Sequence, residues 1–103
     1  MFNMKTISIH QMQENASSAE SLLKSLANSY RLMVLCHLVN GEMSVGELEK
    51  KVGLSQSSLS QHLAKLREQK IVSFRKQGTT VLYRIADKNA LQILESLHSI
   101  FCE

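Results

Sequence analysis

Residues 44–70 read SVGELEKKVGLSQSSLSQHLAKLREQK, and residues 71–85 continue as IVSFRKQGTTVLYRI. Ser44 and Glu47 have the spacing of a capping box, in which each side chain accepts a hydrogen bond from a backbone N–H at the start of a helix. We expect this helix to end at Gly53, because glycine readily adopts the left-handed conformation that stops a helix. The stretch therefore predicts a short helix followed by a tight turn.

A second helix and a β-hairpin follow this turn. Ser55 is placed to cap the second helix. Its apolar side recurs at helical spacing and consists of Leu59, Leu63 and Leu66. Residues 71–76 and 79–85 are rich in β-branched and aromatic residues on either side of Gln77 and Gly78, which predicts two strands joined by a turn at this pair. A helix-turn-helix followed by a hairpin is the arrangement of a winged helix.

Further helices are expected on both sides of this unit. Apolar residues at helical spacing predict helices over residues 11–27 and 29–39, and Asp87 is placed to cap a final helix that ends near residue 101. The expected buried face of the second of these helices consists of Leu32, Leu35, Cys36 and Val39. The expected fold is a mainly α winged helix-turn-helix, in the order α-α-α-α-β-β-α, with a small β-hairpin wing.

The length and composition fit one folded domain. A chain of 103 residues can bury one modest core. We expect a flexible N-terminal arm over residues 1–10 and a single DNA-binding and dimerisation domain over residues 11–103. No apolar run approaches the roughly 20 residues of a membrane span, and no signal peptide is evident, so we expect a cytoplasmic protein without a membrane partner.

The positive charge is concentrated in the second half of the chain. Residues 50–84 hold eight lysines and arginines and one acidic residue, Glu68, whereas the net charge of the whole chain is only +3. A positive block that coincides with a helix-turn-helix is what neutralisation of DNA phosphates requires. This coincidence favours double-stranded DNA as the partner over the alternative of a merely solvated surface.

Short polar side chains occupy the side of the second motif helix that lies opposite its leucines. Serine hydroxyls and glutamine amides can approach base edges, whereas an ordinary soluble surface would carry more glutamate and lysine. The two interpretations of His62, a packed histidine and a DNA contact, are both open. The basic residues before the hairpin turn are expected to contact phosphate or the minor groove. The candidate DNA-binding residues are Gln56, Ser57, Ser58, Ser60, Gln61, His62, Lys65, Arg75, Lys76 and Gln77.

The two terminal helices carry more apolar surface than one small domain can cover. In the last helix the apolar stripe consists of Ile93, Leu94, Leu97, Ile100 and Phe101. The alternative is that both helices pack only within their own domain. We expect a homodimer through the first and last helices, because a two-fold DNA site needs two recognition helices one groove turn apart.

Together these residues resemble the ArsR/SmtB family of bacterial repressors over nearly the whole chain. The resemblance rests on LANSYRLMVL at residues 26–35, SVGEL at 44–48, LSQSSLSQHL at 54–63, and RKQG with VLYR at 75–78 and 81–84. It implies a dimeric winged helix that binds operators and responds to a metal or to a thiol-reactive signal. It implies no enzymatic activity, and a thiol oxidoreductase would need a catalytic cysteine with a base in a pocket, a combination that the sequence does not indicate.

The metal sites of that family have no counterpart at the matching positions. No cysteine pair lies near residues 47–50, Asp87 is followed by Asn89 in place of histidine, and Ile100 stands where a distal histidine is needed. We therefore expect no metal and no cofactor, although a metal-responsive or inducer-independent member of the family remains an alternative.

Cys36 and Cys102, together with the closing LHSIFCE at residues 97–103, resemble the HlyU/BigR/SqrR subgroup. That resemblance implies a redox-sensing dithiol, in which a bridge formed by reactive sulfur species or an oxidant lowers operator affinity. Cys102, with His98 four residues earlier, would be the attacking thiol, and Cys36 the resolving one. A repressor is expected, and an activator that displaces a nucleoid protein is the alternative.

Overall fold

The computed structural model describes residues 8–101 of the chain. Within this range the helices are α1 (Ile9–Leu26), α2 (Ser29–Leu38), α3 (Val45–Val52), α4 (Gln56–Glu68) and α5 (Lys88–Phe101), and the strands are β1 (Met43–Ser44), β2 (Val72–Gln77) and β3 (Thr80–Ile85). None of these helices has both the length and the apolar character that crossing a bilayer requires.

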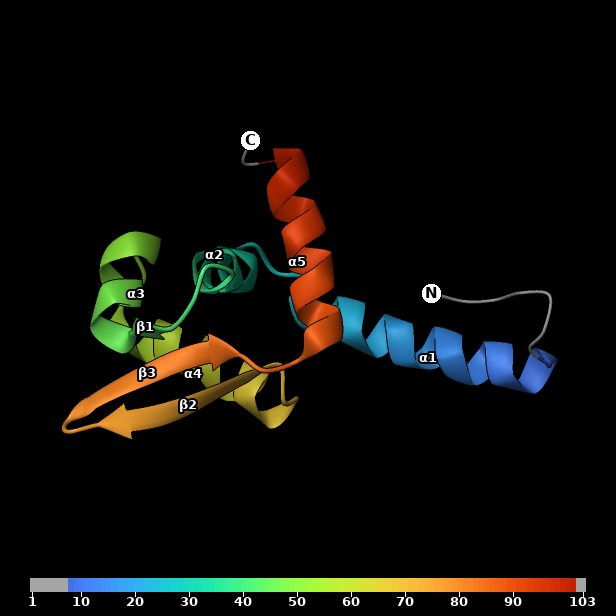
Figure 1. The fold of residues 1–103 in the computed structure, drawn as a ribbon, viewed down its shortest axis with the longest axis horizontal. Coiled ribbons are helices and arrows are strands. Elements are labelled where there is room, and N and C mark those ends of the chain that lie inside the picture. The colour runs from blue at the N-terminus through green and yellow to red at the C-terminus, as the bar shows by residue number, and fades with distance from the viewer. Residues whose placement is uncertain (1–7, 102–103) are drawn as a thin grey trace.

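The winged helix predicted from the sequence is confirmed, with one added strand. Helices α3 and α4 form the helix-turn-helix, and the β2–β3 hairpin extends from the body as the wing (Figure 1). The prediction of a two-stranded sheet was incomplete, because β1 pairs with β3 to give the antiparallel order β1-β3-β2. Because β1 is only two residues long, it cannot show the alternation of apolar and polar residues that predicts a strand from the sequence.

The hairpin turn lies one residue later than expected. Gln77 pairs with Thr80, so Gln77 belongs to β2 and the two-residue loop consists of Gly78 and Thr79. Gly78 has a φ of 64°, a left-handed conformation that glycine adopts without steric cost.

The helix caps follow the sequence closely. Ser44 and Glu47 form the predicted capping box, and Gly53 ends α3 with a φ of 74°. The hydroxyl of Ser55 accepts the backbone N–H of Ser58 at the start of α4. The carboxylate of Asp87 accepts the N–H groups of the second and third residues of α5. Helix α1 begins at Ile9, two residues before the predicted start, and Ser8 caps it.

One core lies between α2, α3, α4, α5 and the sheet. The predicted leucines of α4 are buried in it: Leu59, Leu63 and Leu66. The predicted face of α2 was partly wrong, because Val34, Leu35 and Leu38 are buried, whereas Leu32, Cys36 and Val39 are only half-buried. Cys36 therefore lies at the edge of the core.

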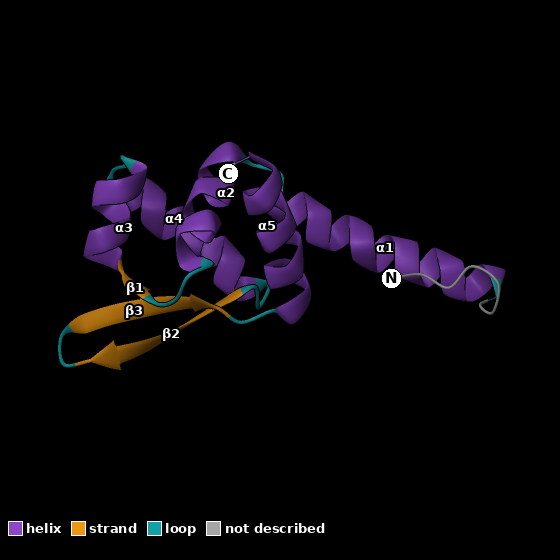
Figure 2. Ribbon diagram, turned by 45° about the horizontal axis from the view of Figure 1, so that its top comes forward, coloured by secondary structure: helices purple, strands orange, loops and turns teal. Residues whose placement is uncertain are grey.

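Helix α1 projects away from this body, on the side opposite the wing (Figures 1 and 2). Its buried residues, Ser25 and Leu26, lie in its last turn. The rest of α1 has little packing within residues 8–101, and Ile9 and Leu23 are 77% and 55% exposed.

Candidate nucleic-acid interface

Helix α4 presents the predicted polar face to solvent. Its leucines anchor one side in the core, which turns the opposite side outward. The exposed side chains on that side are Gln56, Ser57, Ser60, Gln61 and Lys65, and Ser58 is half-buried beside the capping hydroxyl of Ser55. The structure thus brings these predicted residues together on one helix.

His62 lies between the core and this face. It is half-buried, and its ring centroid is 6.1 Å from that of Tyr30 in α2. Burial lowers the pKa of His62, and the positive charges of Arg31 and Lys65 lower it further. Both interpretations of His62 that the sequence left open therefore stay open, and the lowered pKa favours the uncharged form of the histidine.

A groove connects α4 with the wing and the start of α3. Its volume is about 520 Å³. The lining residues are Ser44, Val45, Gly46, Glu49, Gln56, Ser60, Thr79, Thr80, Val81 and Tyr83. Sequence reasoning did not select Thr79 and Thr80, which lie at the hairpin tip and line the same groove as Gln56 and Ser60. Their position directly after Gly78 was the signal that could have identified them.

The wing carries the predicted residues Arg75, Lys76 and Gln77, and all three are exposed. Arg75 already has a partner, because its Nε and Nη2 atoms each donate to a carboxylate oxygen of Glu42 at 2.8 Å. This bond from Arg75 lowers the pKa of the Glu42 carboxyl, and the carboxylate in turn raises the pKa of Arg75. The ion pair offsets the charge that Arg75 would offer to a phosphate.

A cluster of side chains holds the wing against α4. Arg67 donates from Nη1 to the hydroxyl of Tyr83 at 3.1 Å, and its guanidinium lies 5.2 Å from the ring centroid of Phe74. The rings of Phe74 and Tyr83, which face each other across the two strands, are 5.6 Å apart. These contacts fix the angle between the wing and the polar face of α4.

Cys36 opens onto a second cavity, of about 510 Å³. The lining residues are Leu32, Met33, Cys36, His37, Asn40, Met43, Lys51 and His98. His98 belongs to the last turns of α5, so this cavity brings the end of α5 next to Cys36. Cys102 lies outside the described residues. Within residues 8–101, no group of three or more histidine, cysteine or acidic side chains is arranged to hold a metal ion.

The apolar stripe of α5 is divided between the core and the surface. Leu94 is fully buried, Ile93 and Leu97 are half-buried, and Ile100 and Phe101 are 68% and 79% exposed. Helix α1 adds a shallow apolar groove, lined by Ala16, Ala19, Glu20, Leu23, Lys24 and Ala27. Both terminal helices thus carry uncovered apolar surface, as the sequence predicted.

Comparison with known proteins identifies the family. Residues 28–73 match the family model described as "Bacterial regulatory protein, arsR family". The chain is 42% identical to the transcriptional activator HlyU of Vibrio cholerae over 97 residues, which cover 94% of this chain and 90% of that protein. It is 44% identical to the biofilm growth-associated repressor of Xylella fastidiosa over 91 residues, which cover 88% of this chain and 80% of the repressor.

Solved structures agree with this match. The reduced form of HlyU from Vibrio cholerae superposes with a TM-score of 0.89 at 43% identity, covering 92% of this chain and all of that one. The repressor BigR from Xylella fastidiosa gives a TM-score of 0.85 at 42% identity, covering 92% of this chain and 94% of that one. This winged helix therefore belongs to the arsR family of bacterial regulatory proteins, and it is a transcriptional regulator rather than an enzyme.

Proposed function

We propose that this regulator binds operator DNA as a homodimer, and that bridging of Cys36 and Cys102 by reactive sulfur species or an oxidant lowers its operator affinity. The observation that carries the DNA-binding part is the polar face of α4, which is exposed and continuous with the hairpin tip through one groove. A helix of this kind fits the major groove, and the wing then lies along the neighbouring backbone.

The roles of the candidate residues follow from their positions. Gln56, Ser57 and Gln61 contact base edges from the first two turns of α4, where a recognition helix reaches the groove. Ser58, Ser60 and Lys65 bind sugar or phosphate beside them. Lys76 and Gln77 contact the backbone from the wing, and Arg75 joins them when its ion pair with Glu42 opens.

The exposed apolar residues of α1 and α5 support the homodimer. Leu23, Ile100 and Phe101 are all more than half exposed, and large apolar side chains left exposed on two neighbouring terminal helices favour an interface there. Pairing of these helices across a two-fold axis would give the dimer two copies of α4, as a two-fold DNA site requires.

The sensing part rests on the cavity that Cys36 shares with His98. His98 lines the same cavity as Cys36, and Cys102 follows His98 by four residues in the sequence. Helix α5 also contributes apolar surface to the proposed dimer interface. A bond from Cys36 in α2 to Cys102, which follows α5 in the sequence, would therefore change the spacing of the two α4 helices, and a coupling of about 1 to 3 kcal/mol lowers affinity about 5- to 150-fold.

The chemistry requires an external oxidant of one of two classes. With a persulfide donor, the Cys102 thiolate takes the outer sulfur and releases the donor thiol. The Cys36 thiolate then attacks the inner sulfur and expels hydrosulfide, which leaves a disulfide. Each further persulfide donor that reacts with a cysteine before the bridge closes adds one sulfur atom to the bridge. With a peroxide, Cys102 becomes a sulfenic acid and an alcohol or water leaves; attack by Cys36 then releases water.

The direction of the output has two candidates. The relatives at 44% and 42% identity are named a repressor and an activator, respectively. We propose a repressor. An activator that displaces a nucleoid protein would use the same DNA contacts, and a promoter reporter in cells with and without the regulator distinguishes the two.

The DNA-binding proposal is tested by changing Ser57 and Gln61 to alanine together. Both side chains are exposed, so we expect the fold to be retained while affinity falls for DNA fragments that the unchanged protein selects from genomic DNA. Fluorescence anisotropy measures this affinity. The matched control replaces Ser18 and Gln92, an exposed serine and glutamine outside α4, with alanine. Equal affinities of the two double variants would contradict the placement of α4 in the groove.

The sensing proposal is tested by intact mass and peptide mapping after separate treatment with polysulfide and peroxide. We expect a cross-link between Cys36 and Cys102 and a parallel fall in operator affinity, both absent from Cys36→Ser and Cys102→Ser. Added sulfur in the cross-link only after polysulfide identifies a reactive-sulfur sensor. No cross-link under either treatment would refute the dithiol switch and leave the metal-responsive or inducer-independent alternatives.

A further inference from the structure

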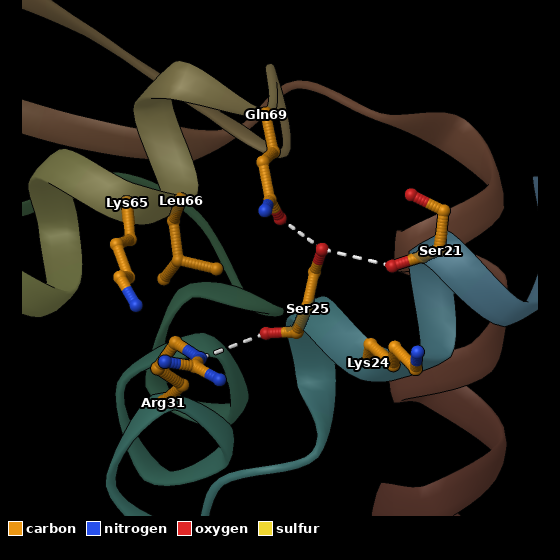
Figure 3. Close-up of a pocket in the computed structure, with 7 residues that line it drawn as sticks. All are labelled: Ser21, Lys24, Ser25, Arg31, Lys65, Leu66 and Gln69. Atoms are coloured by element: carbon orange, nitrogen blue, oxygen red, sulfur yellow. Dashed lines mark hydrogen bonds between the residues drawn. The ribbon is translucent and has the colours of Figure 1, made fainter.

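A third cavity lies where the end of α1, the start of α2 and the second half of α4 meet (Figure 3). Its volume is about 260 Å³, several times the roughly 30 Å³ that one water molecule occupies in the liquid. The lining residues are Ser21, Lys24, Ser25, Arg31, Lys65, Leu66 and Gln69. None of these described lining residues is acidic, so the cavity collects positive charge from three different helices.

Partly buried hydrogen bonds build the wall of this cavity. Ser25 is 8% exposed, and its hydroxyl lies within hydrogen-bonding reach of the backbone oxygen of Ser21 and of Oε1 of Gln69 (Figure 3). Nε of Arg31 donates to the backbone oxygen of Ser25 at 2.8 Å. The bond from Nε restrains the guanidinium of Arg31, and the amide nitrogen of Gln69, a residue that lines the cavity, is left as a donor.

The cations around the cavity are poorly neutralised by the protein itself. Within residues 8–101, the terminal nitrogens of Arg31 and the ammonium of Lys65 have no acidic partner. Lys24 pairs only with Glu20, at 3.8 Å and with both side chains mostly exposed, a contact that stabilises little. Burial is the first cause of the lowered pKa of His62, and the positive charges of Arg31 and Lys65 lower it further.

We propose that this cavity binds one phosphoryl group, with the fork of Arg31 and the ammonium groups of Lys24 and Lys65 on its non-bridging oxygens. A fixed guanidinium matches phosphate geometry through two parallel hydrogen bonds, and lysines add charge from the sides. The oxygens of the phosphoryl group, whether it is a free phosphate or a phosphodiester, also accept hydrogen bonds from the hydroxyl of Ser21 and the amide of Gln69.

Two sources supply this chemistry, a backbone phosphate of bound DNA and free inorganic phosphate. Lys65 lies one helical turn after Gln61 on α4, so the cavity borders the face that we propose to read bases. The DNA source rests on the proposed function, whereas binding of free phosphate does not. In either case the phosphate would tie α1, on which we place the dimer contact, to α4.

The first arm of the test uses the protein without DNA. The pKa of His62 is measured by NMR in phosphate and in chloride at equal ionic strength. Bound phosphate offsets the charges of Arg31 and Lys65, so we expect the pKa of His62 to rise in phosphate, and Lys65→Gln to remove this phosphate-dependent rise. The control, Lys88→Gln, removes an exposed lysine that does not line the cavity and should keep the rise.

The second arm measures the salt dependence of DNA binding. Lys24→Gln removes a cation that lies on α1, outside the recognition helix. If a DNA phosphate occupies the cavity, affinity falls for all sequences alike, and the slope of log affinity against log salt is reduced by about 1. Lys88→Gln should leave both unchanged.

The two arms distinguish the sources and the possible failures. A rise in the His62 pKa in phosphate identifies free phosphate as a ligand. A reduced salt slope of DNA affinity in Lys24→Gln identifies a phosphate of the DNA backbone as the ligand. If the unchanged protein binds no DNA, the proposed function fails while the His62 arm still decides the phosphate site. No rise in the first arm, together with either an unchanged slope or no DNA binding in the second, would overturn the proposal.

Discussion

Gly53 shows how one residue ends a helix at the turn of the motif. It ends α3 with a φ of 74°, and a Cβ added there would meet no atom within 4 Å. The cost of a side chain at this position is therefore conformational rather than steric. We expect Gly53→Ala to lower the free energy of unfolding by about 1 to 2 kcal/mol, the usual cost of the left-handed region for an L-residue. Chemical denaturation measures it.

The control for this prediction is the same change at Gly46. This glycine lies in the first turn of α3 without a positive φ, and an added Cβ would lie 3.9 Å from Oγ of Ser44, an ordinary contact. Since alanine is the better helix former, Gly46→Ala should leave the stability unchanged or raise it by up to about 1 kcal/mol. Equal destabilisation by both changes would contradict the conformational explanation.

Single residues were the most predictable level of this structure. The caps at Ser44, Ser55 and Asp87 use bonds to groups two or three residues away, so the local sequence determines them. The ion pair of Arg75 with Glu42 could not be predicted, because it joins residues 33 positions apart and depends on the path of the chain before β1. The same holds for the contact between Ser25 and Gln69.

At the scale of elements, the wing is held to the segment before β1 by that ion pair. Protonation or removal of the Glu42 carboxylate would free Arg75 to bind phosphate. We expect Glu42→Gln to raise DNA affinity and to make the slope of log affinity against log salt more negative by up to about 1. Anisotropy titrations over a range of salt concentrations measure this change. The control is Glu14→Gln, an exposed carboxylate on α1, and an unchanged slope in Glu42→Gln would mean that Arg75 does not reach DNA.

The same pair gives a pH dependence of known sign. The pKa of Glu42 is lowered from 4.5 by the bond from Arg75, so its stabilisation is complete above pH 4.5 and is lost as the pH falls through the lower folded-state value. Unfolding experiments should show a smaller loss of stability over that acidic range in Glu42→Gln than in the unchanged protein.

The order and type of the elements could be predicted from the sequence, whereas the buried face of a helix could not always be. The leucines of α4 are its only large apolar residues, so they were correctly predicted to form its buried face. In α2 the five successive residues 32–36 are all apolar, so a frame containing Cys36 and one containing Val34 fit equally well, and packing against α4 and α5 decides between them. The strand β1 forms because β3 offers an open edge, a tertiary cause with no local signal.

At the scale of the whole molecule, the proposed dimer predicts association in solution. We expect the unchanged protein to sediment as a dimer, and Leu23→Asp or Ile100→Asp to sediment as a monomer, because each places a charge in the proposed apolar contact. Ser18→Asp adds the same charge to an exposed position of α1 and should remain dimeric. Dimers in all three variants would place the interface elsewhere.

The projection of α1 bears on the lifetime of a chain that has not yet found its partner. Most of the stability of a protein helix comes from tertiary packing, and the first four turns of α1 pack little against the body of the domain. An unassociated chain would therefore open along α1 long before its core unfolds, and proteases would cut there first. Through this one helix, subunit association would decide how long each newly made chain survives.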